Sequence, residues 1–138
     1  MIDYLTLKYF KRSEFVCSCG CNRADMDEDF VMTLERIREK LGQPMTISSA
    51  FRCENHSISK AKIAKGAPNG GAHHLGMAID AHSAGTVAMN IIALALDEKT
   101  INGIGVSQKG PWNSRFVHID CVPVDNNYGI TRGALWSY

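Results

Sequence analysis

The sequence predicts an α+β domain, in which a small sheet packs against helices. Two segments carry apolar residues at helical spacing, residues 27–41 and 83–96. Four shorter segments have the alternation or the β-branched content of strands and are bounded by turn residues: 45–51, 77–80, 101–106 and 115–122. A length of 138 residues fits one domain, residues 1–138, which buries roughly two-thirds of its unfolded surface.

The composition is typical of a soluble globular protein, with 45% apolar and 21% charged residues. A net charge of +1 gives no electrostatic support for nucleic-acid binding, which would need a basic stripe. No apolar run approaches the roughly 18 residues of a membrane span, and the N-terminus lacks the features of a signal peptide. We therefore expect a product that is cytoplasmic as synthesised, or is exported by another route, with no nucleic-acid partner and no membrane span.

The helix over residues 27–41 has clear start and stop signals. Asp25 and Asp27 are its candidate N-caps, and Gly42 with Pro44 ends it. The stripe at helical spacing that we expect to be buried consists of Phe30, Val31, Leu34, Ile37, Arg38 and Leu41. This helix is expected to build the core and to carry no chemistry.

The other segments give weaker signals. We expect a short strand or arm over Leu5–Phe15, a partly helical stretch over Glu54–Lys65 and a flexible loop over Gly66–Gly71. Ser83 is the expected N-cap of the second helix. The tail, residues 126–138, is rich in turn residues, and its aromatic side chains are expected to cover the core or to edge a cleft.

A glycine-rich stretch leads into two adjacent histidines and then into a carboxylate. His73 and Asp80 are seven positions apart, which suits neither one helical face nor one face of a single strand. A bend at Gly76, followed by a short strand over Met77–Asp80, would direct the imidazole and the carboxylate toward one point. Histidine and carboxylate ligands of this kind bind first-row metals.

A second histidine lies in the alternating segment 115–122. There Phe116, His118 and Asp120 share one face of the predicted strand. Either histidine alone would more often be an ordinary core residue. Taken together, His73, Asp80 and His118 are the three protein ligands that a catalytic zinc ion needs, with a fourth position left open.

The cysteine content leaves several interpretations open. Five cysteines, an odd number, argue against a complete disulfide framework. Cys17, Cys19 and Cys21 alternate without the usual two-residue gaps of a zinc site, so a turn around Gly20 with partly buried thiols is favoured over a zinc knot. One of these thiols could also meet Cys53 in an oxidising setting.

Four ordered motifs resemble the M15 zinc peptidases, which are D-Ala-D-Ala carboxypeptidases and L-alanyl-D-glutamate-type endopeptidases of cell-wall metabolism. Two of the motifs lie at residues 73–80 and 116–120, around the proposed ligands. Segments 14–21 and 47–53 match the short branch of the family. The resemblance spans about residues 9–136 and is more specific than any single motif.

The resemblance implies a small, mainly antiparallel sheet with flanking helices, of the hedgehog or D-Ala-D-Ala-peptidase type. It implies one catalytic Zn²⁺ that hydrolyses a peptide bond in peptidoglycan stem peptides, by carboxypeptidase or endopeptidase cleavage. Arg52, at a strand end, would stabilise the oxyanion or bind substrate, although a surface ion pair is the simpler alternative. A monomeric lysis or virion enzyme of phage origin, acting on the cell wall after release, is also expected.

The sequence departs from the family pattern at two positions. Many relatives carry a glutamate three residues before the last histidine, where this chain has Arg115, so Asp120 is the candidate general base. The alternative role for Asp120 is to orient a ligand histidine. Gly71 stands where relatives often have a serine that holds the substrate backbone. These departures also allow a different class of protein, a zinc-stabilised, non-catalytic binding or virion structural module.

Overall fold

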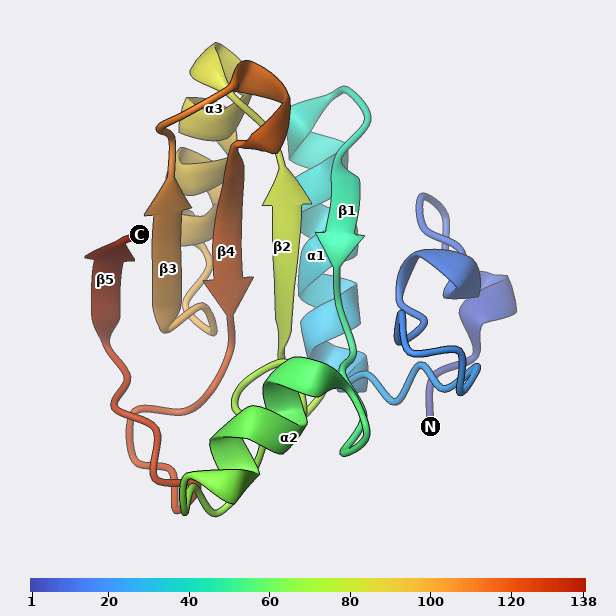
Figure 1. The fold of residues 1–138 in the computed structure, drawn as a ribbon. Helices are drawn as coiled ribbons and strands as arrows, with labels where there is room; N and C mark the ends of the chain where they lie inside the picture. The colour runs from blue at the N-terminus through green and yellow to red at the C-terminus, as the bar shows by residue number, and fades with distance from the viewer.

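The computed structural model describes residues 1–138, which form one five-stranded sheet with two helices packed on one face (Figure 1). The strands are β1 (Thr46–Ser49), β2 (Ala78–His82), β3 (Gly103–Ser107), β4 (Phe116–Asp120) and β5 (Ala134–Ser137). The helices are α1 (Glu28–Leu41), α2 (Ser57–Ala64) and α3 (Gly85–Asp97), with 3₁₀ turns η1 (Tyr4–Thr6), η2 (Arg12–Glu14) and η3 (Trp112–Ser114). The predicted α+β class is confirmed.

The strand order is β1-β2-β4-β3-β5, and the first four strands pair antiparallel. In the central pair, Asp80 of β2 lies opposite His118 of β4. Alternate residues of these strands, Val117 and Ile119 among them, point into the hydrophobic core. Asp80 and His118 therefore face the other side of the sheet.

Helix α1 follows its sequence signals closely. The Asp27 carboxylate accepts a hydrogen bond from the Phe30 N–H at 2.8 Å, and the helix ends at Gly42 with φ of +70°. Its fully buried apolar side chains are Phe30, Val31, Leu34 and Ile37. Figure 1 shows α1 and α3 side by side behind the sheet, so this stripe forms the centre of the core.

Helix α3 begins one residue later than the predicted N-cap implies. Ala84 occupies the N-cap position without a side-chain hydrogen bond, and Gly85 is the first helical residue. The Ser83 hydroxyl instead donates to the Ala81 carbonyl at 3.0 Å, so the prediction of Ser83 as the N-cap is wrong. The backbone must turn sharply out of β2 here, which Gly85 permits with φ of +58°.

The N-terminal segment forms two 3₁₀ turns, and the short strand or arm expected over residues 5–15 is not a strand. A buried carboxylate secures this segment to the domain. Glu35 of α1 accepts hydrogen bonds from the backbone N–H groups of Lys8, Tyr9 and Phe10 at 2.9–3.0 Å. These N–H groups point to a side chain and not to a neighbouring strand, which explains why no sheet edge forms here.

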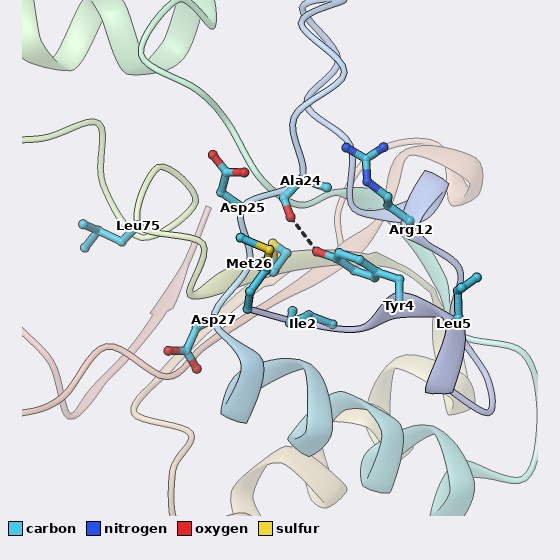
Figure 2. A pocket seen from close by; sticks show the side chains of 10 residues that line it. Ile2, Tyr4, Leu5, Arg12, Ala24, Asp25, Met26, Asp27 and Leu75 are labelled. Atoms are coloured by element: carbon cyan, nitrogen blue, oxygen red, sulfur yellow. Dashed lines mark hydrogen bonds between the residues drawn. The ribbon is translucent and has the colours of Figure 1, made fainter.

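The same segment borders a broad, mostly apolar hollow (Figure 2). Tyr4 crosses it and donates its hydroxyl hydrogen to the Ala24 carbonyl, as the dashed line in Figure 2 shows. Its remaining lining includes Ile2, Leu5, Met26 and Leu75. This hollow shares no residue with the site described below.

The tail contains a strand that its turn-rich sequence did not suggest. Strand β5 pairs parallel with β3 at the edge of the sheet, with Gly105 opposite Trp136. A Cβ atom on Gly105 would lie 2.6 Å from the indole ring, so only glycine leaves room for Trp136 over the sheet.

Among the three helices, none combines the length and the apolar character that a membrane span requires.

Candidate metal centre

The structure brings the three predicted ligands together. His73 Nε2 lies 3.3 Å from Asp80 Oδ1, and His118 Nδ1 lies 3.0 Å from the same oxygen. One donor atom from each residue falls within 4.8 Å of the others, and all three residues are buried. Two neutral imidazoles and one carboxylate around a common point are a typical set of ligands for a catalytic metal.

Two local features place these side chains. Asp80 and His118 are cross-strand partners in the β2–β4 ladder, so their side chains stand next to each other. His73 lies in a turn that ends at Gly76, where φ is +71°. A Cβ atom on Gly76 would lie 2.1 Å from the Asp25 carbonyl oxygen, so the turn requires glycine.

In each histidine, the ring nitrogen that points away from Asp80 forms a hydrogen bond that fixes the orientation of the ring. The Nδ1 atom of His73 lies 2.7 Å from the Ala50 carbonyl oxygen, and Nε2 of His118 lies 2.8 Å from Asp120 Oδ2. Because both partners are acceptors, these nitrogens carry the protons. The lone pairs of His73 Nε2 and His118 Nδ1 are therefore free at the centre, which is the arrangement that supports a bound metal.

Asp80 is held in its ionised form. Burial alone would raise the pKa of this carboxyl, but the neighbouring imidazoles of His118 and His73 outweigh burial and hold the pKa well below its usual range. Its second oxygen, Oδ2, accepts a hydrogen bond from the Arg52 guanidinium at 3.2 Å. Arg52 also donates to the Ser49 hydroxyl at 3.0 Å, so its side chain is fixed at both ends of the guanidinium.

The pKa values of the two histidines shift in opposite directions. Burial lowers the pKa of His73, which keeps its imidazole neutral. Burial also acts to lower the pKa of His118, but the carboxylates of Asp120 and Asp80 outweigh it and raise this pKa. The negative surroundings that favour a proton on His118 also favour a bound cation, so the residues present fit a divalent metal.

Asp120 lies behind His118 and does not line the cleft. It is completely buried, and Arg132 Nε donates to both of its oxygens at 2.8 and 3.0 Å. Gly103 leaves the space for this carboxylate, because a Cβ atom there would lie 2.4–2.6 Å from its atoms. The sequence predicts Asp120 as the general base or as the orienting partner of a histidine, and this geometry favours the orienting role.

A cleft of about 480 Å³ opens in front of the three ligands. Its lining consists of Arg52, Ile58, Lys62, Ala72, His73, Asp80, Phe116, His118, Arg132, Trp136 and Tyr138. Three of these residues are cationic, and Asp80 is the only carboxylate among them. Trp136 of β5 and Tyr138, which directly follows this strand, form an aromatic wall with Phe116, as expected for a tail that edges the cleft.

Lys62 and Arg132 were not identified as site residues from the sequence. Arg132 follows a turn-rich segment and Lys62 lies on a short polar helix, so neither has a local signature. Lys62 lies at the cleft rim and forms no salt bridge. Partial burial of its ammonium group, followed by the charges of Arg52 and Arg132, lowers its pKa. A Cβ atom on Gly71 would lie 2.6 Å from Lys62 Nζ, so a serine there would displace the ammonium group.

Three other polar residues, two histidines and an arginine, lie outside the cleft. His56 caps α2 by accepting the Ile58 N–H at 3.2 Å, and Nδ1 of His74 is buried without a hydrogen-bond partner. Arg115 donates to the Gly110 carbonyl at 3.1 and 3.2 Å. None of these residues lines the cleft, so no side chain there replaces the missing glutamate.

Comparison with known proteins agrees with this geometry. The sequence model of the family described as Peptidase M15 matches residues 8–120, a range that includes the three ligands and Asp120. No curated protein and no solved structure matches the chain. Because the match covers most of the 138 residues, the chain belongs to the M15 peptidase family.

Proposed function

We propose that this chain is a zinc-dependent peptidase that hydrolyses a peptide bond in peptidoglycan stem peptides. The main observation behind the proposal is that the imidazole rings of His73 and His118 are both fixed by hydrogen bonds. His73 and His118 each use one ring nitrogen in a fixed hydrogen bond and present the other beside Asp80. Family membership supplies the reaction type, and the cleft supplies room for a peptide.

A zinc ion held by His73, Asp80 and His118 would polarise the scissile carbonyl and lower the pKa of its water ligand to near neutrality. Arg52 contributes by fixing Asp80 through the 3.2 Å contact and by placing a positive charge at the cleft wall. A preorganised cation at this place stabilises negative charge as it develops on the carbonyl oxygen. Arg52 is thus assigned both a positioning and an electrostatic role.

The charge of the cleft supports an acidic peptide as the substrate. Arg52 and Arg132 are each held in an ion pair, with Asp80 and Asp120, which leaves the ammonium group of Lys62 as the cation without a partner. Stem peptides of peptidoglycan carry free carboxylates, and Lys62 is suited to bind one of them. The aromatic wall of Trp136 and Tyr138 offers apolar contact to the rest of the peptide.

The second candidate is a binding or virion structural module that keeps the metal and lacks hydrolysis. The observation that favours it is the absence of a second carboxylate from the cleft lining, since Asp120 is buried behind His118. A general base that takes a proton from water must be within hydrogen-bonding reach of it. The two candidates therefore differ in turnover and not in metal binding.

The deciding experiment incubates the purified protein with peptidoglycan and separates the released products by mass. A peptidase releases peptides or D-alanine, the release stops with a chelator, and added Zn²⁺ restores it. The product masses then distinguish carboxypeptidase from endopeptidase cleavage. Stoichiometric zinc with no product from several types of cell wall would contradict the peptidase and favour the binding module. A phage lysis role remains a prediction from the family resemblance.

A further inference from the structure

A second group of metal-binding side chains lies outside the catalytic cleft. The sulfur atoms of Cys17, Cys19, Cys21 and Cys53 all lie within 4.8 Å of one another. The sulfur atoms of Cys19 and Cys53 are 3.3 Å apart. None of the four lines the cleft, and the fifth cysteine, Cys121, is not in the group.

The chain bends sharply to bring these thiols together. An extended segment would space Cys17 and Cys21 about 13 Å apart at the backbone. Here Gly20 has φ of +92° and Asn22 has φ of +58°, and Asn22 is the only residue other than glycine with positive φ. The loop closes with a hydrogen bond from the Cys17 N–H to the Arg23 carbonyl at 2.8 Å. Backbone of this kind persists where a local function requires it.

We propose that the four cysteines bind a structural zinc ion. Tetrahedral zinc with Zn–S bonds of about 2.3 Å holds its sulfur ligands about 3.8 Å apart, close to the spacing of this group. A backbone N–H group also points at one of the sulfur atoms. The Cys53 N–H donates to Cys17 Sγ at 3.4 Å. Such a donor stabilises the negative charge of a thiolate ligand.

A disulfide is the competing use of these thiols, and it accounts for less of the geometry. A bond between Cys19 and Cys53 would occupy two sulfur atoms and leave Cys17 and Cys21 beside it with no role. A single tetrahedral ion uses all four. The short spacing between Cys17, Cys19 and Cys21 does not prevent this, because the turn at Gly20 reverses the chain.

The position of Cys53 connects the proposed ion to the catalytic cleft. Cys53 follows Arg52 directly, and Ala50, whose carbonyl accepts from His73, lies three residues earlier. The N-terminal segment, residues 1–27, has no strand and only two 3₁₀ turns of its own. The ion would therefore link the N-terminal segment, through Cys17, Cys19 and Cys21, to the loop after β1, through Cys53. That loop positions both Arg52 and His73.

The test measures zinc content and zinc–sulfur scattering by X-ray absorption in the full chain, purified with a reductant and Zn²⁺. We expect two zinc ions per wild-type chain and two in Cys121→Ser, the matched control. In a His73→Ala/His118→Ala double variant we expect one ion, surrounded by four sulfur atoms. Cys21→His keeps a ligand at its position, so it should retain both ions and replace one sulfur by nitrogen in the scattering.

The double histidine variant makes this test independent of the proposed peptidase. A zinc ion with four sulfur ligands in that variant supports the structural site even if the wild-type protein cleaves nothing. The site is refuted if that variant holds no zinc and all its cysteines react with a thiol reagent before denaturation. A Cys19–Cys53 disulfide found by mass in protein purified with zinc and reductant would refute it as well.

Discussion

The substitution Asp120→Asn separates the two roles considered for this carboxylate. Asp120 Oδ2 lies 2.8 Å from His118 Nε2, and the side chain is completely buried. If Asp120 orients His118, the change weakens zinc binding, and loss of such an orienting partner typically costs 10–100-fold in metal affinity, about 1.4–2.7 kcal/mol. The asparagine would also present an NH₂ group in place of one acceptor oxygen to the donors His118 and Arg132, and this loss of an acceptor costs a further ~1–3 kcal/mol of folding stability.

The assay titrates metal-free wild-type and variant protein with Zn²⁺ and records both bound zinc and peptide release. We expect the Asp120→Asn curve to shift to about 10–100-fold higher zinc and then to recover most of the wild-type rate. Asp125→Asn is the matched control, since Asp125 is exposed nearby, and its curve should not shift. If the variant binds zinc normally and loses about 10²–10⁴-fold in rate, Asp120 is the general base and the orienting role is wrong.

Three further predictions test the cleft and the fold. Lys62→Met should raise KM by about tenfold, because the free ammonium group is lost, and should change kcat little in steady-state kinetics, whereas Lys60→Met on the exposed side of α2 should leave both unchanged. Gly103→Ala should displace the Asp120 carboxylate and so lower the zinc affinity in the same titration. It should also lower the free energy of unfolding, measured with denaturant, by about 1–3 kcal/mol. An unchanged zinc titration would contradict the orienting role of Asp120. Glu35→Gln should lower the free energy of unfolding by about 2–3 kcal/mol, because three backbone N–H groups lose a charged acceptor, while zinc content stays the same.

Local patterns predicted the parts of the fold whose causes are local. The Asp27 cap, the Gly42 stop and the alternation of residues 116–120 each lie within a few residues of the structure that they specify. The same holds for the bend at Gly76, where the positive φ favours glycine. His73, Asp80 and His118 could be proposed as ligands because two such segments converge through one strand pair.

The features that the sequence did not reveal depend on contacts between distant segments. Strand β5 forms because Gly105, far away in the chain, leaves space for Trp136. The role of Asp120 depends on Arg132, which reaches it from a turn in the tail. Lys62 becomes a cleft residue only when α2 lies beside the end of the sheet at which β2 begins (Figure 1). No periodicity in the sequence encodes these pairings.

The central claim is that zinc held by His73, Asp80 and His118 performs the hydrolysis. The most direct measurement compares wild-type protein with His118→Ala on one peptidoglycan preparation, after chelation and stepwise return of Zn²⁺. The predicted result is peptide release that saturates with zinc in the wild type and is absent from the variant at every zinc concentration. Equal release by chelated wild type, or by His118→Ala, would contradict the claim.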